Sequence, residues 1–501
     1  MEDTSGRSKQ KQIKNSIDFK GVANLDMGIG ITAYGVYLPR YRVYRKEIGE
    51  AWGATGRGEL TIGNEDEDVI TMAIEAANNA LASAGMSNGS SLDAFYLATS
   101  SSPYVEGSSA MHLKMALRGK PTADAVDFNS TARGGTLALK ASLDALKSGR
   151  IKNVVLVTGD MHKVSPGSNL EKTLGAGAAA IVLGTDNPIA EIESTYSYST
   201  FILDYWRADG QIYPQDYEPK FTRRWGYEHH VVEATKGLLK QTCSTAADYD
   251  YVVLQTSDVR GALAAAKTLG VSRDKLVLSP VTDSIGEIGN ASVFLGLIEV
   301  LEQAQVNDRV LVVSYGFGGS DAFSIRVKRD HKLPENLSLK HYLDSKILLN
   351  YVGFLQKTKT LAQADIGIKS IVSPASPLIW RDQEAFFSHL GAKCKACGYV
   401  NYPPSQRHLC IKCGHQELEL VEISRKGRVH TCSLNYKLPP PLESPLPIIV
   451  VDLEDGVRHR ALGTEMSGDE LTIDMEVELI LRLITVENGA RLYGYKFRRP
   501  R

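Results

Sequence analysis

The chain has 501 residues, too many for one ordinary hydrophobic core, so about two to four folding units are expected. Hydrophobic residues make up 43% of it and charged residues 23%, the balance of a globular protein rather than a disordered or fibrous one. A formal net charge of -1 argues against a general binder of nucleic acid or of membrane surfaces. No apolar run approaches the roughly 20 residues that a membrane-spanning helix needs.

The first residues are polar and rich in lysine, and they lack the apolar segment of a secretory signal. We therefore predict a disordered tail over residues 1–26. The chain contains six cysteines, four of them in two Cys-x-x-Cys pairs. In a chain of this length, that usage indicates a reducing compartment and a metal site rather than disulfide bonds, so we predict a cytoplasmic protein.

Short apolar runs alternate with helical patterns from Gly28 to Val327. The runs predict buried strands at 93–98, 123–128, 153–158 and 178–183, then at 251–255, 275–278 and 310–314. Apolar residues at helical spacing predict helices at 68–84, 134–146, 261–269 and 291–301. This alternation predicts an α/β fold with parallel sheets covered by helices. Because the pattern restarts after about residue 187, we predict a duplication, with halves at 27–188 and 189–365; the second half ends in a helical segment over 330–357.

The pattern changes in the last quarter of the chain. Residues 366–389 are predicted to form a linker and a helix, because two prolines and two serines lie within 373–377. Beyond the cysteines, five short runs rich in Val, Ile, Thr and Tyr predict strands at 427–436, 448–453, 458–464, 476–484 and 492–497. Five strands without long helices favour a small β-barrel of the OB type over 419–501.

Four cysteines predict a metal site over residues 390–418: Cys394, Cys397, Cys410 and Cys413. Two thiolate pairs on tight turns supply four soft ligands for tetrahedral Zn²⁺, and a glycine follows each pair to allow the turn. Four thiolates leave no open position on the metal. We therefore predict a structural zinc ribbon without a catalytic role. The other two cysteines, Cys243 and Cys432, are expected to be packing residues.

Several segments together resemble the archaeal and bacterial HMG-CoA synthases of the thiolase superfamily. They are GIGITAYGVYLPRYR at 28–42, DEDVITMA at 66–73, DYWR at 204–207, GN at 289–290, SYG at 314–316 and GSDAFSIR at 319–326. The resemblance covers about residues 28–361 and implies a duplicated, layered αβαβα thiolase fold. The remainder resembles the zinc-ribbon/OB domain that accompanies thiolases and HMG-CoA synthases. In archaea such a protein bridges the two enzymes and helps to hold the CoA tail.

The resemblance also implies where catalytic residues should lie, and three of those positions hold other residues. The family's acyl-accepting cysteine at a helix N-terminus corresponds to Ala132, which carries no nucleophile. Its general acid/base glutamate corresponds to Ser100, and its histidine to Gln255. We therefore expect no HMG-CoA synthesis through an acyl-cysteine. These three residues are still predicted to contact substrate, together with three positions that match the family pocket: Asn290, Ser314 and Gly318.

Other groups near the predicted pocket could supply acid/base chemistry. Asp160, His162 and Lys163 follow a predicted strand and could lie at its rim, although a solvated loop is the commoner place for such residues. Three further candidates could have their pKa values retuned in a dry pocket: Tyr104, Tyr205 and Asp258. The sequence does not select among them.

Two functions remain open at this stage. The first is an enzyme that makes or cleaves a carbon–carbon bond of a CoA thioester by aldol, retro-aldol or Claisen chemistry, as in the retro-aldolases of the same superfamily. A retro-aldol cleavage needs a base and enolate stabilisation but no covalent nucleophile. The second is a non-catalytic CoA-binding scaffold that supports a partner thiolase. Both predict acyl-CoA binding, a homodimer and a separate thiolase, with neither nucleic acid nor membrane as a partner.

Overall fold

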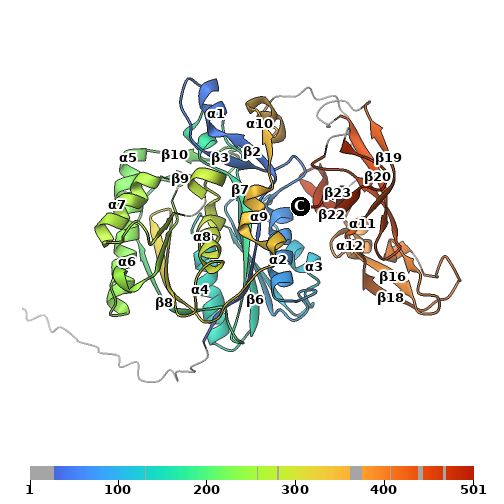
Figure 1. Cartoon of the computed structure of the whole chain (residues 1–501), viewed down its shortest axis with the longest axis horizontal. Helices are drawn as coiled ribbons and strands as arrows, with labels where there is room; N and C mark the ends of the chain where they lie inside the picture. The colour runs from blue at the N-terminus through green and yellow to red at the C-terminus, as the bar shows by residue number, and fades with distance from the viewer. Residues whose placement is uncertain are drawn as a thin grey trace, which may run out of the picture.

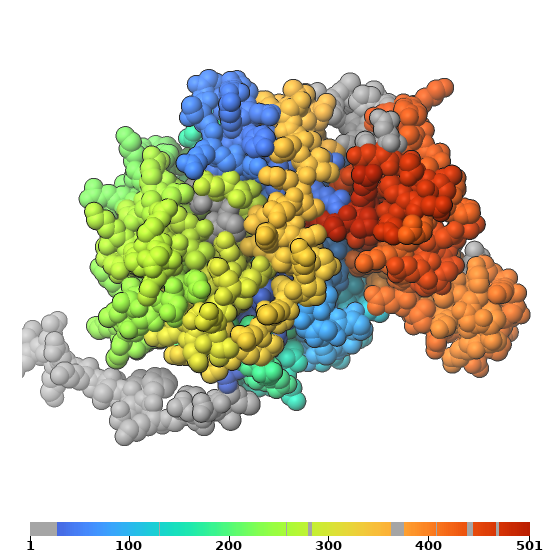
Figure 2. Space-filling model, viewed as in Figure 1, coloured from blue at the N-terminus to red at the C-terminus, as the bar shows by residue number. Residues whose placement is uncertain are grey.

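The computed structural model describes residues 28–129, 131–256, 258–278, 281–361, 375–406, 408–437, 444–466 and 470–501. The predicted tail at 1–26 and the first part of the predicted linker lie outside these ranges. A large α/β part carries a smaller β-rich part at its side, and the space-filling view shows the two in close contact (Figures 1 and 2).

A ten-stranded sheet runs through the α/β part in the order β12-β11-β13-β14-β8-β1-β7-β6-β4-β5. Its first half comprises β1 (Gly30–Tyr37), β4 (Ala94–Thr99), β5 (Asp124–Asn129), β6 (Asn153–Met161) and β7 (Ala176–Gly184). Its second half comprises β8 (Ala190–Ser199), β11 (Tyr251–Leu254), β12 (Leu276–Leu278), β13 (Arg309–Gly316) and β14 (Gly319–Val327). Each half has the same strand order read outward from β1 or β8, which confirms the predicted duplication.

The halves meet where β1 pairs with β8, and the approach there is close. A Cβ atom at Gly30 would lie 2.0 Å from the carbonyl oxygen of Ala190, so only glycine fits. The predicted strands all form, with ends within one to three residues of the prediction.

The predicted parallel pairing is correct for the outer strands of each half and wrong for the central ones, so the sheet is mixed. β4 is parallel to β5 and β6, and β11 is parallel to β12 and β13, but β7 and β14 run antiparallel to both of their neighbours. The connection from β13 to β14 shows the reason. It is a two-residue turn, Phe317-Gly318, in which both residues have positive φ (49° and 66°). Such a turn joins antiparallel strands without a crossover helix.

Helices cover the sheet in layers. α2 (Val69–Ser83) packs on β1, β6 and β7, and α6 (His229–Gln241) packs on β8, β13 and β14. α4 (Gly134–Lys147) packs on β4, β5 and β6. α8 (Ser292–Leu301) contacts strands of both halves, which places it between them. The layered thiolase-type fold predicted from the sequence is thereby confirmed. The other helices here are α1 (Arg45–Ala51), α3 (Ser109–Ala116), α5 (Pro219–Phe221) and α7 (Val259–Leu269), with single-turn or π-type segments at Asn169–Lys172, Thr222–Glu228, Ala246–Asp248, Val281–Ile285, Gly289–Ala291 and Glu335–Leu337.

The closing segment of the second half is not the continuous helical stretch that was predicted. It consists of α9 (Leu339–Asp344), the strand β15 (Ile347–Leu349) and α10 (Tyr351–Lys357). β15 joins a small sheet with β2 (Tyr41–Tyr44) and β3 (Glu59–Ile62). Residues 347–349 therefore form a strand that pairs with β2, where a helix was predicted. The remaining short strands, β9 (Tyr205–Trp206) and β10 (Gln215–Asp216), pair with each other.

The C-terminal part contains a ribbon and a small barrel. The short helices α11 (Ser376–Arg381) and α12 (Gln383–Phe386) lead into the ribbon strands β16 (Leu390–Cys394), β17 (Val400–Asn401) and β18 (Leu418–Glu422), with a 3-10 turn at Pro404–Gln406. The barrel comprises β19 (Lys426–Asn435), β20 (Leu446–Leu453), β21 (Arg458–Leu462), β22 (Glu476–Glu487) and β23 (Ala490–Arg498). Its sheet order is β21-β20-β19-β22-β23, and a parallel bridge from Gly463 to Phe497 closes it. Five strands joined in this way are compatible with the predicted small barrel, and the OB type remains a prediction.

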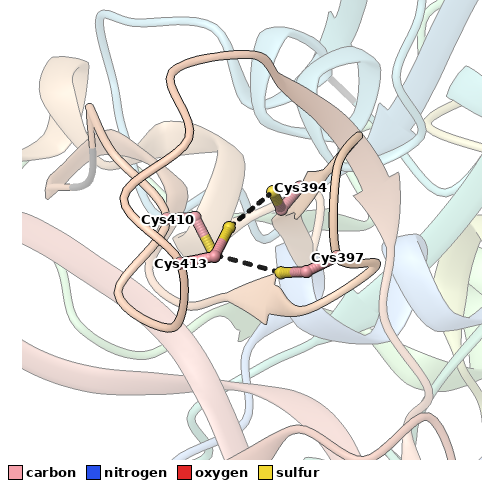
Figure 3. A group of neighbouring side chains, drawn as sticks. All are labelled: Cys394, Cys397, Cys410 and Cys413. Atoms are coloured by element: carbon pink, nitrogen blue, oxygen red, sulfur yellow. Dashed lines mark hydrogen bonds between the residues drawn. The ribbon is translucent and has the colours of Figure 1, made fainter.

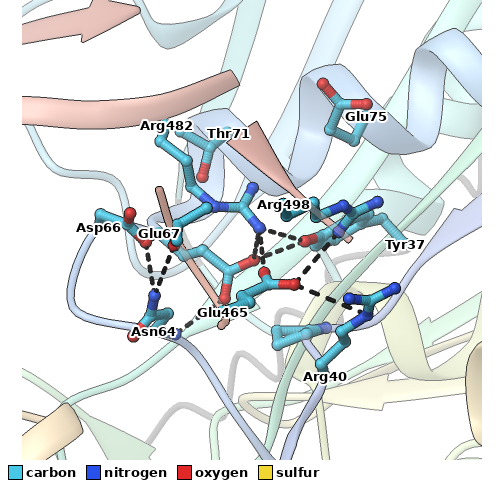
Figure 4. A network of polar contacts seen from close by, with 12 residues as sticks. Tyr37, Arg40, Asn64, Asp66, Glu67, Thr71, Glu75, Glu465, Arg482 and Arg498 are labelled. Atoms are coloured by element: carbon cyan, nitrogen blue, oxygen red, sulfur yellow. Dashed lines mark hydrogen bonds and ion pairs between the residues drawn. The ribbon is translucent and has the colours of Figure 1, made fainter. Parts of the chain in front are cut away.

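A buried ionic network fixes the barrel to the α/β part (Figure 4). Arg482 of β22 lies against the loop before α2, where its guanidinium is within 3.0 Å of Glu67 and 3.5 Å of Asp66. Lys496 donates to Asp66 (2.8 Å), and Tyr493 donates to Asp68 (2.7 Å). Barrel and α/β part therefore share one buried interface, and the apolar core is continuous across it.

Candidate functional site

A cavity of about 530 Å³ opens where strands of both halves of the large sheet end. Three predicted site residues line it together: Ser100 follows β4, Ala132 lies between β5 and α4, and Gln255 follows β11. Parallel strands present their carboxyl ends at one edge of a sheet, and ligands bind at that edge in open α/β folds. The fold thus brings into one cavity three residues that lie far apart in the sequence.

Ala132 lies directly before the N-terminus of α4, between Thr131, which also lines the cavity, and the N-cap Arg133. A helix N-terminus presents unpaired N–H groups and favours negative charge. No cysteine lines this cavity: four of the six form the cluster described below, Cys243 is exposed after α6, and Cys432 lies in the barrel strand β19. The cavity keeps a place for a developing anion but holds no thiol.

Asp160 of β6 is fully buried and ties several loops of the cavity together. Its Oδ1 accepts hydrogen bonds from Thr99 Oγ1 (2.9 Å), Ser100 N (2.7 Å) and Ser101 Oγ (2.9 Å). Its Oδ2 accepts from the backbone N (2.8 Å) and the side-chain Nδ2 (2.9 Å) of Asn290. With both oxygens occupied, Asp160 acts as a structural anchor between the two halves.

His162 lies on the cavity wall with a side chain only 5% exposed. Its Nε2 is 3.3 Å from Ser100 Oγ, and its ring packs edge-on against Tyr205. Burial lowers the pKa of this imidazole, although the nearby Asp160 opposes the change. A neutral imidazole beside a serine hydroxyl can accept a proton near neutral pH. Lys163, the next residue, is exposed.

Glu287 is a cavity residue that sequence reasoning missed. Its Oε1 accepts a hydrogen bond from Gln255 Nε2 (3.2 Å), and Gln255 Nε2 also donates to the carbonyl oxygen of Gly289 (3.0 Å). Burial raises the pKa of Glu287 to about 8. The only signal in the sequence was a glutamate three residues before Asn290, and that alone does not indicate a site.

Three other predicted contact residues lie behind the cavity rather than on its wall. Asn290 uses its side chain to join the N-terminus of α4 to Asp160, since its Oδ1 accepts from Gly135 N (2.7 Å). Ser314 bonds Thr136 of α4 (2.9 Å between hydroxyls). Gly318 sits in the β13–β14 turn. All three support the elements that carry the cavity, and a contact with substrate remains a prediction for them.

Of the remaining acid/base candidates, two line the cavity and one does not. Tyr104 lies toward the barrel, where its hydroxyl accepts from Arg491 N (3.2 Å). Tyr205 lines the cavity with a buried hydroxyl that has no hydrogen-bond partner. Asp258 lines the cavity but is held by Arg223 (3.1 Å) and Arg260 (3.1 Å). Although burial opposes it, hydrogen bonds from these arginines lower the pKa of Asp258, so it is a poor base.

A second cavity of about 650 Å³ adjoins the first, and the two share wall residues that include Lys172, Arg260 and Glu287. Four cations line it: Arg45, Arg57, Lys172 and Arg260. Only two acidic residues, Asp283 and Glu287, lie on the same wall. We call this basic cavity the outer chamber and the cavity lined by Ser100 and Ala132 the inner chamber. In the inner chamber three cations and four carboxyl groups nearly balance, so the pair suits a ligand with an anionic end and a neutral reactive end.

The four ribbon cysteines form a separate cluster (Figure 3). Their sulfur atoms all lie within 4.8 Å of one another, with Cys394 and Cys413 at 3.6 Å and Cys397 and Cys410 at 3.5 Å. Zinc–sulfur bonds of about 2.3 Å in a tetrahedron place sulfurs about 3.8 Å apart, so the donor set and its size fit Zn²⁺. Gly398 and Gly414 have φ of 72° and 74° and close the two turns that present the thiols. The cysteine cluster lies in the ribbon, and none of its residues lines the cavity.

Comparison with known proteins agrees with this architecture. Residues 239–326 match the family model of the C-terminal part of 3-oxoacyl-[acyl-carrier-protein] synthase III. A solved HMG-CoA synthase complexed with CoA is similar at TM-score 0.60 and 22% identity, covering 69% of this chain and 95% of that one. The 3-oxoacyl-[acyl-carrier-protein] synthase III of Aquifex aeolicus aligns at TM-score 0.55 and 23% identity, over 60% of this chain and all (100%) of that one. These likenesses define the α/β part as a thiolase-superfamily fold.

Sequence relatives are more specific. The hydroxymethylglutaryl-CoA synthase of Thermococcus sibiricus is 36% identical over 338 residues, which are 65% of this chain and 96% of the relative. That of Methanopyrus kandleri is 34% identical over 344 residues, 66% of this chain and 98% of the relative. The chain belongs to the hydroxymethylglutaryl-CoA synthase family. Among the helices that the structure describes, none is long and apolar enough to cross a membrane.

Proposed function

We propose that this protein takes part in forming or breaking a carbon–carbon bond of a CoA thioester, by aldol, retro-aldol or Claisen chemistry and without an acyl-cysteine. The observation that carries the proposal is the cavity itself. It keeps the helix N-terminus of α4 and the buried groups His162 and Glu287, while the nucleophile position holds Ala132. Proton transfer and anion stabilisation remain possible in such a site, whereas thiol acylation does not.

The two chambers support a CoA ester as the ligand. CoA carries its phosphates at one end and its thioester at the end of a long neutral arm. Arg45, Arg57 and Arg260 offer charge for phosphates in the outer chamber, and the inner chamber offers Ser100 and Ala132 around a reactive carbonyl. Relatives of this chain are named for a CoA thioester, which agrees with this assignment.

Retro-aldol cleavage fits the retained groups better than Claisen transfer. It requires a base for the β-hydroxyl and stabilisation of an enolate thioester, both available without a covalent intermediate. The test is incubation of the purified chain with 3-hydroxy-3-methylglutaryl-CoA, with acetyl-CoA release followed by mass spectrometry. Cleavage at a rate that depends on protein concentration supports the proposal. CoA-ester binding without turnover, even with a thiolase present, would contradict it.

A scaffold role for a partner thiolase is the second candidate, and the ribbon supports it. Five large apolar side chains are exposed around the ribbon and α11: Trp380 (75%), Tyr399 (37%), Leu409 (48%), Ile411 (59%) and Leu420 (56%). Exposed apolar surface of this kind marks protein contacts. We also propose that Zn²⁺ holds this ribbon together, that two chains pair through the edge strand β5, and that the protein is cytoplasmic.

One reconstitution separates the two functions. The isolated chain and its mixture with a thiolase would be assayed on the same β-hydroxyacyl-CoA, with the thiolase's own cysteine intact or replaced. Turnover that needs the partner's cysteine supports the scaffold. Turnover by the isolated chain supports the enzyme.

A further inference from the structure

Five buried polar atoms without hydrogen-bond partners belong to residues that line the inner cavity: Glu287 Oε2, Gln255 Oε1, Asp204 Oδ1 and the hydroxyls of Tyr205 and Tyr227. Buried polar groups are nearly always paired, and each exception requires an explanation. Five on the residues of one cavity favour a polar ligand that supplies the missing partners.

The orientation of Gln255 is determined by its neighbours. Its Nε2 lies within hydrogen-bond distance of two acceptors, Glu287 Oε1 (3.2 Å) and the carbonyl oxygen of Gly289 (3.0 Å). A flipped amide would place an oxygen against both acceptors, so the nitrogen must face them. Gln255 therefore holds one oxygen of Glu287 in place, and the Ser292 hydroxyl and the Gly289 backbone also act on this carboxyl, where they oppose the effect of burial on its pKa. Its Oε2 has no hydrogen bond of ordinary geometry.

The other acidic groups that line the inner cavity differ from Glu287. Asp258 is paired with two arginines, and Asp216 is exposed. Asp204 accepts a hydrogen bond from the Tyr315 hydroxyl with Oδ2 (2.5 Å) and has an unpaired buried Oδ1, but the residue as a whole is only half-buried. Asp160 lies behind the wall, with both oxygens occupied by donors. Among the carboxyl groups that line the inner cavity in the described structure, Glu287 combines burial, a fixed orientation and an oxygen without a hydrogen bond of ordinary geometry.

We propose that Glu287 is the proton-transfer residue of this cavity, with Gln255 as its positioning residue. The inference rests on the proposed function and specifies its acid/base group. In the cleavage direction, Glu287 Oε2 removes the β-hydroxyl proton, the Cα–Cβ bond breaks, and its electron pair forms the thioester enolate. The carboxyl then returns the proton to Cα. In the reverse direction the carboxylate takes a proton from Cα, the enolate carbon attacks a carbonyl, and the new alkoxide receives the proton.

Burial supports this role, since it raises the pKa of Glu287 to about 8. A carboxyl with that pKa exchanges protons readily near neutral pH, unlike an ordinary glutamate, which stays ionised. It acts as the acid below about pH 8 and as the base above it.

The test is hydrogen–deuterium exchange at the methyl group of acetyl-CoA in D₂O, followed by mass spectrometry. Exchange needs only Cα deprotonation, so no second substrate is required. Glu287→Gln should lower the exchange rate about 100-fold or more, and Glu287→Asp should retain part of it. Exchange by the unaltered protein should rise with pH as the carboxyl ionises and level off above about pH 8.

Glu299→Gln is the matched control. Glu299 is a partly buried carboxyl on α8 whose pKa is also raised by burial, to about 7, but it does not line the cavity. Its substitution should change exchange less than about twofold. Equal exchange by the unaltered protein and by Glu287→Gln would overturn the role of Glu287 and leave the proposed function intact. Absence of exchange in the unaltered protein, with acetyl-CoA still bound, would overturn the role of Glu287 and the catalytic proposal together and favour the scaffold.

Discussion

Arg482 of the barrel and Glu67 of the α/β part form an ion pair of 3.0 Å, and both side chains are wholly buried. Arg482 also pairs with Glu465, which in turn faces Arg498. Burial alone would raise the pKa of Glu465, but Arg482 and Arg498 lower it to about 2. Each buried charge in this interface lies beside a charge of opposite sign (Figure 4). The loss of one side chain therefore leaves its partner buried and unpaired.

Removal of the central arginine should therefore be costly. We expect Arg482→Met to lower the free energy of unfolding by about 3–5 kcal/mol, because it leaves Glu67 and Glu465 buried without their partner. Urea denaturation measures this. Arg428→Met is the control, since Arg428 pairs with Glu476 at the surface and should contribute less than ~1 kcal/mol. Equal losses for the two variants would show that the interface does not depend on the buried pair.

The ribbon should depend on metal. We expect about one Zn²⁺ per chain by elemental mass spectrometry, and loss of both the metal and the ribbon fold in Cys394→Ser or Cys410→Ser, because structural zinc binding is coupled to folding. Cys243→Ser should keep its zinc, since Cys243 is exposed and lies outside the cluster. A metal-free protein with an ordered ribbon would contradict the assignment.

The cavity should not become acylated. After incubation with radiolabelled acetyl-CoA, we expect no stable acyl group on the protein, because Ala132 offers no thiolate. Ala132→Cys should bring a thiol to the N-terminus of α4 without restoring HMG-CoA synthesis, if Ser100 and Gln255 occupy the positions of the family's glutamate and histidine, as predicted. Peptide mass spectrometry that finds an acetyl group on the unaltered protein beside α4 would show that the family motif is misplaced here.

Acid should weaken the junction of ribbon and barrel. Burial lowers the pKa of His389 to about 3 and that of His459 to about 4. Between about pH 6.5 and 4, both rings stay neutral in the folded protein while the unfolded chain binds protons, so stability is highest above pH 6.5 and falls with pH. Each ring should contribute about 1.4 kcal/mol per pH unit in that window.

His459→Phe should remove the contribution of one ring, about 1.4 kcal/mol per pH unit, from the pH dependence of the free energy of unfolding. Urea denaturation at pH 7, 6 and 5 measures this. An unaltered slope in His459→Phe would mean that the ring is protonated in the folded state.

Much of the fold could be predicted because its signals are local. The predicted helix at 68–84 is α2 (Val69–Ser83), and the predicted strand at 123–128 is β5 (Asp124–Asn129). Apolar spacing reports these directly, since one side of each element must face the core. The cysteine spacing likewise predicted a cluster that the folded ribbon confirms, because each Cys-x-x-Cys turn forms within four residues.

Antiparallel pairing was not visible in the same way. A strand carries no local mark of its partner's direction, so the strand predicted at 178–183, which is β7, was assigned to a parallel sheet, and β14 was not predicted. The turn at Phe317-Gly318 makes β14 antiparallel to β13. The short strand β15 was missed because its pairing with β2 depends on a segment about 300 residues away.

The sequence by itself determined the family, the alternation of strands and helices in two similar halves, and the four-cysteine cluster; it also predicted that Ala132, Ser100 and Gln255 occupy the family's catalytic positions. Only the tertiary structure decided which other groups lie beside these three residues. Glu287 lies 32 residues from Gln255 in the chain, yet its carboxylate bonds the Gln255 amide, and His162 lies 62 residues from Ser100 and faces its hydroxyl. The buried surroundings that alter the pKa values of Glu287 and His162 are assembled from strands of both halves. The pKa shifts are caused by those surroundings, so they exist only once the chain has folded.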